Sequence, residues 1–237
     1  PLSWQHHLSQ QGYYLIGCPH RPDPAKGLLD GVHLVAELKA LRQVPGEPML
    51  LIPRWIDSRI NPTDGHVYRT LYDALLDEAS QLGVRENIHI HEWVNATDMA
   101  GYYSGCDVVL AVGSFVEAFG NVPVEAAACG TPAVVAAVAG HVGKLSPAFV
   151  TEVPPGDIRT TCDALAERLS SHFDSNGARD EIAQLYSFEG MIDGYRHVIE
   201  HARQRPPLTM KPLSPITHVR LAAWCRVFDH RIYHDYL

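Results

Sequence analysis

The chain has 237 residues, of which 46% are hydrophobic and 19% are charged, and its formal net charge is −8. This composition is that of a folded protein and excludes a disordered chain, collagen and a coiled coil, while the length suits one large domain or one domain with an appendage. The negative charge and the absence of a dense Lys/Arg run argue against a nucleic-acid-binding surface.

The cysteine content and the hydropathy pattern indicate the cellular setting. The five cysteines are odd in number and form no Cys-x-x-Cys pair, which favours a reducing compartment, so we expect a cytoplasmic protein. No apolar stretch is long enough to cross a bilayer, and the polar first eleven residues do not resemble a signal peptide. Because the sequence begins with Pro1 rather than Met, we expect a processed or excised piece.

Short apolar runs alternate with longer segments of helical periodicity, which is typical of repeated strand–helix–strand units. The predicted strands are 13–17, 49–53, 88–91, 108–111, 133–136 and 149–153. The predicted helices are 27–41, 67–82, 98–104, 122–129, 158–169 and 178–202. We therefore expect an α/β fold, a Rossmann-like doubly wound parallel sheet of about six strands.

The two ends of the chain are expected to lie outside this domain. We predict a linker over 1–12, a single domain over 13–203, and a Pro-rich connector followed by a helical tail over 204–237. In the tail, apolar residues recur at three- and four-residue steps and would form one stripe on a helix: Leu221, Trp224, Phe228 and Ile232. This stripe either packs back on its own domain or docks on a second domain or subunit.

The most informative segment is the loop that leads from the strand 108–111 into the helix 122–129. Gly113 and Gly120 allow the backbone to approach a ligand closely, and Pro123 suits the first turn of a helix. Free N–H groups and the helix dipole at such a helix start can bind a diphosphate. We expect this role for the backbone of Phe119, Gly120, Asn121 and Val122.

A glutamate stands on either side of this turn, at Glu117 and Glu125. The spacing of eight is not specific, because it also occurs at Glu78/Glu86 and Glu181/Glu189. The middle pair alone brackets a loop-to-helix turn, whereas exposed helix faces explain the other two. Glu125 lies in the first turn and should point away from the phosphate, toward hydroxyl groups such as a ribose diol.

Residues 13–200 resemble the C-terminal, nucleotide-sugar-binding domain of retaining GT-B glycosyltransferases of the family 4 type. The resemblance is strongest in EAFGNVPVEAAACGTP, which contains a Glu-x7-Glu motif from Glu117 to Glu125. It also includes RPDPAKG at 21–27 and VPPGD at 153–157. The family resemblance implies a hexosyltransferase that transfers a sugar from a nucleoside diphosphate donor, such as a UDP- or GDP-sugar, with retention of configuration and without a cofactor or metal.

The same resemblance implies roles for individual residues. Glu117 would contact the hydroxyls of the donor sugar, and Glu125 would contact the ribose. Arg21 and Lys26, five apart, would bind the diphosphate and stabilise it as the leaving group. Lys26 also has a simpler interpretation, as a surface lysine at a helix start.

Two further parts of the donor site are expected from loops. The base would lie near 92–94, beside Trp93 and Val94, and His141 could line the sugar site or be a structural histidine in a loop.

The sequence departs from the family pattern at several of these positions. His20-Arg21 replaces the usual Gly-Arg, Arg54-Trp55 follows the second strand in place of a Gly-rich turn, and AGHVGK at 139–144 replaces Gly-Gly-x-x-Glu. A complete GT-B enzyme also has a preceding domain that supplies most of the acceptor site. We therefore expect an excised half, a chain that works with a separate acceptor-domain partner, or a non-catalytic nucleotide-sugar-binding module.

Other chemistries fit the sequence less well. The pairs His89/His91 and His230/His234 have a spacing that could suit a metal, but no cysteine stands nearby at a zinc-like spacing, so we predict no metal site. Ser114 lacks the second glycine of a nucleophile elbow. A dehydrogenase is disfavoured because no Gly-x-Gly-x-x-Gly follows the first strand.

Overall fold

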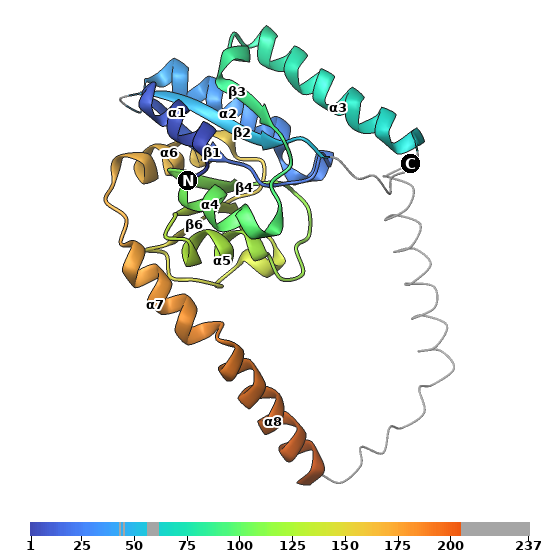
Figure 1. Ribbon diagram of the computed structural model, residues 1–237, viewed down its shortest axis with the longest axis vertical. Coiled ribbons are helices and arrows are strands. Elements are labelled where there is room, and N and C mark those ends of the chain that lie inside the picture. The colour runs from blue at the N-terminus through green and yellow to red at the C-terminus, as the bar shows by residue number, and fades with distance from the viewer. Residues whose placement is uncertain (43, 45, 56–61, 205–237) are drawn as a thin grey trace. The chain divides into compact units, whose positions relative to one another are not determined.

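The computed structural model describes residues 1–42, 44, 46–55 and 62–204 (Figure 1). The chain divides into two compact units, Pro1–Ser187 and Phe188–Leu237. The division falls before the last described helix, and the domain end predicted at residue 203 stays a prediction. The predicted apolar stripe of the tail lies outside the described residues.

The first unit is built on a parallel sheet. Its strands are β1 (Tyr13–Gly17), β2 (Glu47–Pro53), β3 (Ile88–His91), β4 (Val108–Ala111), β5 (Ala133–Ala136) and β6 (Val150–Val153). They lie in the order β3-β2-β1-β4-β5-β6, and every pair is parallel. The inner strands are almost continuously apolar and buried, as expected when helices cover both faces of a sheet. This confirms the α/β, Rossmann-like fold.

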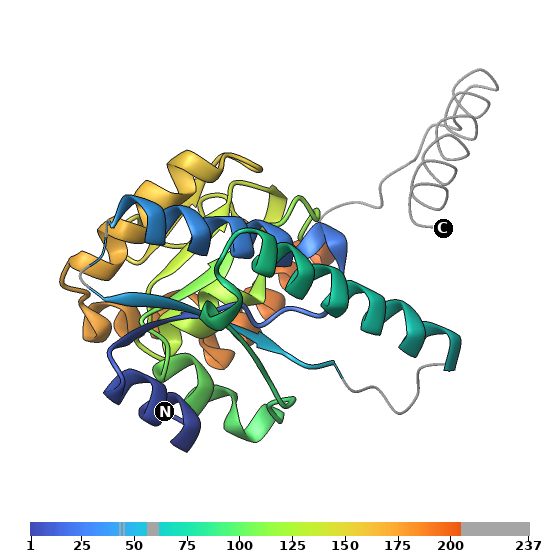
Figure 2. The ribbon, with the colours of Figure 1, turned by 90° about the horizontal axis from the view of Figure 1, so that it is seen from above.

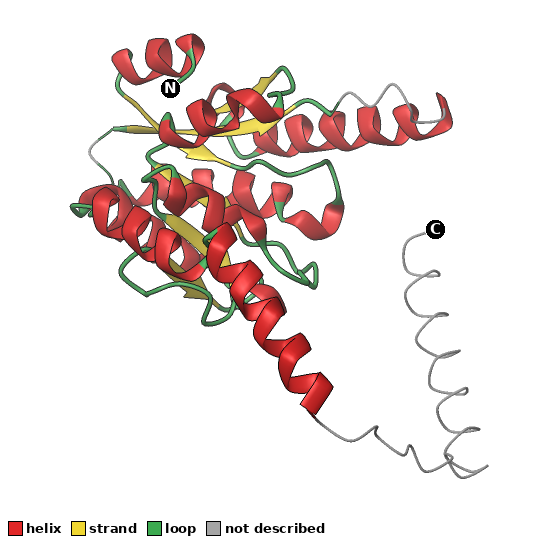
Figure 3. Ribbon diagram, turned by 60° about the horizontal axis from the view of Figure 1, so that its bottom comes forward, coloured by secondary structure: helices red, strands yellow, loops and turns green. Residues whose placement is uncertain are grey.

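Helices cover the sheet on both sides, as Figures 2 and 3 show. The helices of the first unit are α1 (Ser3–Gln10), α2 (Leu28–Leu41), α3 (Pro62–Gln81), α4 (Met99–Ser104), α5 (Asn121–Ala128), α6 (Ile158–Ser170) and α7 (Ser175–Leu185), and α8 (Phe188–Gln204) belongs to the second unit. One core cluster joins α2, α3 and α6 to the sheet, and a second joins α1, α4, α5 and α7 to the opposite face. Side chains alternate along a strand, so Ile16 and Leu15 of β1 belong to different clusters.

Two predicted segments differ from the structure. Residues 1–12, expected to be a linker, contain α1, whose buried Gln5 donates to the carbonyl of Tyr102 at 2.9 Å. The helix predicted over 178–202 is two helices, because the chain leaves the helical conformation at Tyr186 and Ser187. Serine is favoured just before a helix start, which accounts for the new beginning at Phe188. Taken by itself, α8 has a strongly apolar face, with Tyr195 and Val198 each 64% exposed.

The strand order fixes where a ligand can bind. The chain runs from β1 outward to β2 and β3, and then returns to place β4 on the other side of β1. The loops that leave β1 and β4 therefore turn in opposite directions and leave a crevice at the carboxyl ends of the strands, where α/β proteins bind ligands.

Candidate functional site

The loops that follow β1 and β4 are in direct contact. The N–H of Phe115 donates to the carbonyl of Ala25 at 3.0 Å. A Cβ atom added at Gly113 would lie 2.1 Å from the same carbonyl oxygen, so a larger residue would push the loops apart. This close approach explains why residue 113 is a glycine. From the sequence we expected Gly113 to let a ligand approach the backbone, whereas in the structure it lets the loop after β1 approach.

Lys26 and Glu117 are brought together by these loops, although they are 91 positions apart. The Lys26 ammonium donates a short hydrogen bond to Oε1 of Glu117. Their side chains are only 12% and 22% exposed, and the ammonium also lies 3.8 Å from the centroid of the Phe115 ring. A partly desolvated pair of this kind is more tightly coupled than an exposed ion pair.

The start of α5 lies in the same loop. Gly120 occupies the N-cap position with φ of +71°, and no side chain there accepts a hydrogen bond from the helix. The first N–H groups of α5 are thus left without a capping side chain, which is the arrangement that anions favour. This turn is formed by Gly120 and its neighbours Phe119, Asn121 and Val122, the residues whose backbone was predicted to bind the donor.

Lys144 is a second cation beside the turn, and the sequence analysis gave it no role. Its ammonium hydrogen-bonds the carbonyl of Phe119 and lies 3.1 Å from the centroid of the Phe119 ring. The carbonyl of Lys144 in turn accepts a hydrogen bond from the Tyr186 hydroxyl at 3.0 Å. Lys144 is 25 positions from Phe119 in the sequence, and no local sequence pattern predicts this contact, which depends on the tertiary structure.

His141 is buried against the same turn. Its Nδ1 lies 3.0 Å from the carbonyl of Ala136, and burial lowers its pKa. A Cβ atom at Gly120 would lie 2.4 Å from Cδ2 of His141, so glycine is needed there for the ring as well as for the positive φ. His141 thus packs against the turn at Gly120, and its contact with a sugar stays a prediction.

A small hollow, which we call the ion-pair pocket, is lined by His20, Lys26, Ala111, Gly113, Phe115, Glu117 and His141. His20 is the member that sequence reasoning missed as a functional candidate. Its imidazole is 7% exposed, and its Nε2 is buried without a hydrogen-bond partner. Burial, reinforced by the charge of Lys26, lowers the pKa of His20 to about 4, so the ring is neutral at pH 7.

Glu125 lies exposed in α5 and is held by one neighbour. The hydroxyl of Tyr103 in α4 donates to its Oε2 at 2.7 Å. Burial, with help from this carboxylate, raises the pKa of Tyr103, so the phenol keeps its proton and remains a donor. One carboxylate oxygen is therefore oriented by the protein, and the other can accept from a ligand hydroxyl.

Arg21 does not join Lys26. Its side chain is exposed, and its guanidinium carbon lies 5.7 Å from the centroid of the Trp55 ring. Trp55 in turn meets Trp93 edge-to-face, with ring centroids 4.7 Å apart. In this structure the neighbouring residue, His20, takes the place beside Lys26 that the sequence analysis expected for the cation at 21.

A second hollow, which we call the His91 slot, lies at the ends of β2 and β3. It contains Trp93 and Val94, the two residues predicted to contact the base, together with His91. Trp93 is 42% exposed, whereas Val94 is buried. Pro19 lines this slot and the adjacent residue, His20, lines the ion-pair pocket, so one loop contributes to both hollows.

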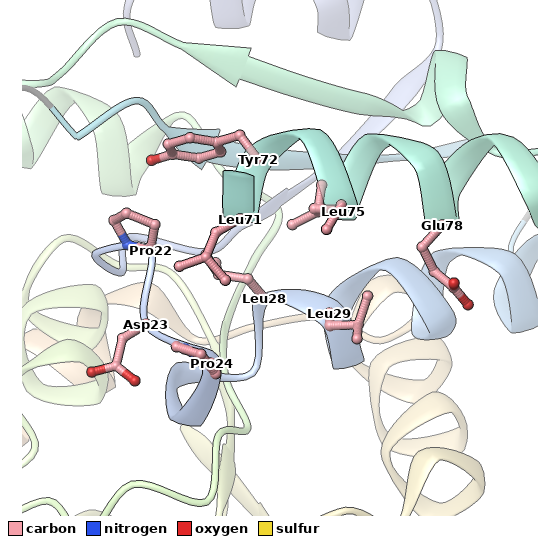
Figure 4. Close-up of a pocket in the computed structure, with 10 residues that line it drawn as sticks. Pro22, Asp23, Pro24, Leu28, Leu29, Leu71, Tyr72, Leu75 and Glu78 are labelled. Atoms are coloured by element: carbon pink, nitrogen blue, oxygen red, sulfur yellow. The ribbon is translucent and has the colours of Figure 1, made fainter. Parts of the chain in front are cut away.

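A larger hollow of about 280 Å³, the apolar pocket, lies between the loop at 22–24 and helices α2 and α3 (Figure 4). Leu28, Leu71 and Leu75 point into it, and Glu78 lies at its edge. The residues predicted to contact the donor do not line it. Its apolar walls suit packing rather than the binding of a charged diphosphate.

The described residues contain no group of three or more His, Cys, Asp or Glu side chains that could hold a metal ion. His89 and His91 both pack on the Trp4 ring instead, with centroid distances of 5.1 and 4.8 Å. Within the described part of the chain, no helix has the length and apolar character needed to span a bilayer.

Parts of this chain are similar to known glycosyltransferases. Residues 69–182, which include Glu117 and Glu125, match the model of the family Glycosyl transferases group 1. A protein named D-inositol 3-phosphate glycosyltransferase from Segniliparus rotundus is 32% identical over 132 residues, which are 56% of this chain and 26% of that protein. One of the same name from Xylanimonas cellulosilytica is 50% identical over 62 residues, or 26% and 15% of the two chains.

Solved structures support the fold. The Anabaena protein HepE in complex with UDP and glucose superimposes with a TM-score of 0.67 at 17% identity, covering 84% of this chain and 51% of HepE. Sucrose-phosphate synthase from Thermosynechococcus elongatus gives a TM-score of 0.64 at 22% identity, covering 85% and 50%.

The chain thus spans less than a third of these curated relatives and about half of these solved structures. The sheet order and the solved structures agree on a Rossmann-like α/β fold, and residues 69–182 are similar to the family Glycosyl transferases group 1.

Proposed function

We propose that this chain is the donor-binding half of a glycosyltransferase that uses a nucleoside diphosphate sugar. The observation that carries the proposal is the Lys26–Glu117 pair beside the uncapped start of α5. A cation and free N–H groups suit a diphosphate, and a carboxylate suits sugar hydroxyls. The match of residues 69–182 to a glycosyltransferase family and the two hollows lined by one loop support the same assignment.

The ion pair suggests how binding and chemistry are linked. A diphosphate that takes the Lys26 ammonium releases the Glu117 carboxylate, which can then accept hydrogen bonds from the sugar. In the transfer, the bond from the anomeric carbon to the diphosphate oxygen breaks and its electrons go to that oxygen. The anomeric carbon bonds to the oxygen of an acceptor hydroxyl, whose proton passes to the departing diphosphate oxygen. Lys26 and the α5 amides stabilise the charge that grows on the leaving group.

Glu125 completes the proposed donor site. It lies one turn into α5 and is oriented by Tyr103, so it can accept from a ribose hydroxyl. Retention of configuration, a UDP- or GDP-linked hexose and action in the cytoplasm are parts of the proposal that rest on the family resemblance. The second candidate function is a nucleotide-sugar-binding module that transfers nothing by itself, because this chain covers only half of the solved structures it resembles.

The test is calorimetric titration with UDP-, GDP-, ADP- and CDP-sugars, followed by measurement of nucleotide release with an acceptor. Because relatives are named for inositol 3-phosphate, D-inositol 3-phosphate is the first acceptor to try. Binding followed by release supports a transferase, and the anomeric proton coupling of the product reports retention or inversion. Binding without release supports the module, and absence of binding to any sugar nucleotide contradicts both.

The role of Glu125 has a separate test. Glu125→Ala should weaken binding of the preferred nucleoside diphosphate by about tenfold, since a hydrogen bond to a charged group contributes about 1.5–3 kcal/mol. Glu86→Ala is the matched control, because Glu86 is exposed and belongs to one of the other glutamate pairs spaced by eight. If Glu125→Ala binds as the unaltered protein does, the ribose assignment is wrong.

A further inference from the structure

The His91 slot has mostly apolar walls and one polar ring. The walls are formed by Pro19, Pro53, Trp93, Val94, Met99 and Tyr102. They come from the carboxyl ends of β1, β2 and β3 and from α4, which also carries the Tyr103 that holds Glu125. The slot has a volume of about 40 Å³, so a flat heterocycle would lie partly outside it, with a face on the apolar walls and its polar edge toward His91.

His91 is fixed in this slot on several sides. Its ring is 5% exposed and stacks on Trp4 at a centroid distance of 4.8 Å and an interplanar angle of 24°. The Tyr102 ring lies at 5.3 Å. Its Nδ1 is 2.8 Å from the carbonyl oxygen of Glu92, while its Nε2 is buried and has no hydrogen-bond partner.

These contacts determine which tautomer the ring has. A carbonyl oxygen can only accept, so Nδ1 must carry the hydrogen that lies between it and Glu92. Burial lowers the pKa of His91 to about 4, with a smaller contribution from His89, so the ring is neutral at pH 7. Nε2 is therefore an acceptor with a free lone pair, and a buried acceptor without a donor is a group that a ligand can satisfy.

We propose that Nε2 of His91 accepts a hydrogen bond from the N3–H of a uracil base, so that this residue selects uridine diphosphate donors. Among the side chains that line the slot, His91 carries a buried nitrogen without a hydrogen-bond partner, and the edge of uracil carries a single N–H donor. Cytosine, adenine and guanine each carry an amino group with two N–H donors, and one of these would stay unpaired in such a slot. The inference rests on the proposed function, since it names the base of the proposed donor.

The test compares UDP with two probes that lack this donor. N3-methyl-UDP has a methyl group in place of the hydrogen, and CDP has an acceptor at N3. Calorimetric titration of the full 237-residue chain should show UDP binding about tenfold or more tightly than either probe, as expected when a buried acceptor loses its donor. Equal affinity for UDP and N3-methyl-UDP, or tighter binding of CDP, overturns the inference.

Variants connect the preference to this residue. His91→Ala should weaken UDP binding by about tenfold and leave little difference between UDP and CDP. His91→Gln can place an amide oxygen near the Nε2 position and should keep part of the preference. His89→Ala is the matched control, because His89 also packs on Trp4 but does not line the slot. A full preference for UDP in folded His91→Ala, checked by circular dichroism, overturns the inference.

The outcomes separate the inference from the proposed function. If the unaltered chain binds nucleoside diphosphates but does not discriminate by the N3–H, the proposed function stands and the role of His91 falls. If it binds none of them, both are overturned. The ¹⁵N chemical shift of His91 Nε2 gives an independent readout, since it should move on addition of UDP and not on addition of N3-methyl-UDP.

Discussion

Residues of one short segment, 20–26, line both the apolar pocket and the ion-pair pocket, but the two pockets differ in the chemical character of their walls. Pro22, Asp23 and Pro24 line the first, while His20 and Lys26 line the second. The apolar pocket is larger and has leucines for walls, whereas the ion-pair pocket is small and contains a cation, a carboxylate and two histidines. The candidate site is therefore identified by its converging charged groups and unpartnered buried nitrogen rather than by the size of the hollow.

The largest expected effect comes from a substitution in the apolar pocket, which should change stability but not ligand binding. Leu75→Ala should lower the free energy of unfolding by about 2–4 kcal/mol, because Leu75 is 5% exposed and belongs to the core under α2 and α3. Nucleoside diphosphate affinity should not change. Urea denaturation and calorimetry measure the two quantities. Leu29→Ala is the control, as Leu29 lines the same pocket but is 48% exposed. A large loss of affinity in folded Leu75→Ala would make the apolar pocket part of the ligand site.

The corresponding change in the ion-pair pocket is Lys26→Met. It removes the cation and leaves Glu117 without its partner, so diphosphate affinity should fall by about tenfold to a hundredfold. The measurement is titration with the preferred nucleoside diphosphate. Lys39→Met serves as control, since Lys39 pairs with Glu47 at 3.2 Å but is 41% exposed and lies at the opposite ends of the strands. Equal losses in the two variants would indicate a general charge effect.

A third substitution tests the contact between the loop after β4 and the loop after β1, where Gly113 lies against Ala25. Gly113→Ala should lower the free energy of unfolding by about 1–3 kcal/mol and weaken donor binding, because the new methyl group would lie 2.1 Å from the Ala25 carbonyl oxygen. Thermal unfolding and titration test this. Gly101→Ala is the matched control, because its Cβ atom would meet only Leu2 Cδ2, at 3.5 Å. If Gly113→Ala binds donor normally, the tight contact between the loops is not needed for the site.

The last and most gradual effect is a pH dependence of stability from the ion-pair pocket. His20 has a pKa of about 4 in the folded protein, where it faces Lys26, Glu117 and His141, against an ordinary value of 6.5. Between these values the unfolded chain binds the proton more readily, so the free energy of unfolding should fall as the pH drops from about 6.5 to 4, by up to about 1.4 kcal/mol per pH unit. Urea midpoints at several pH values should show a shallower fall for His20→Gln. Identical slopes would contradict a buried neutral His20.

Much of the fold was predictable because local sequence signals agree with the tertiary structure. The strands 13–17, 88–91, 108–111 and 133–136 have the observed bounds, since each is a short apolar run between turn residues. The break at Tyr186–Ser187 was missed because helical periodicity continues on both sides of it. Helix α1 was missed because two histidines and two glutamines make it polar, and its burial depends on Gln5 reaching the distant Tyr102.

The sequence by itself determined the α/β class, the loop-to-helix turn at Gly120, and the candidates Lys26, Glu117 and Glu125, because these depend on periodicity, glycine positions and residue types along a short stretch. Only the tertiary structure decided that Lys26 pairs with Glu117, that Arg21 lies over Trp55, and that His20, His91 and Lys144 belong to the candidate site. The physical reason is that burial, charge pairing and an unpartnered nitrogen arise between segments far apart in the chain, and no local pattern records which segments the sheet order brings together.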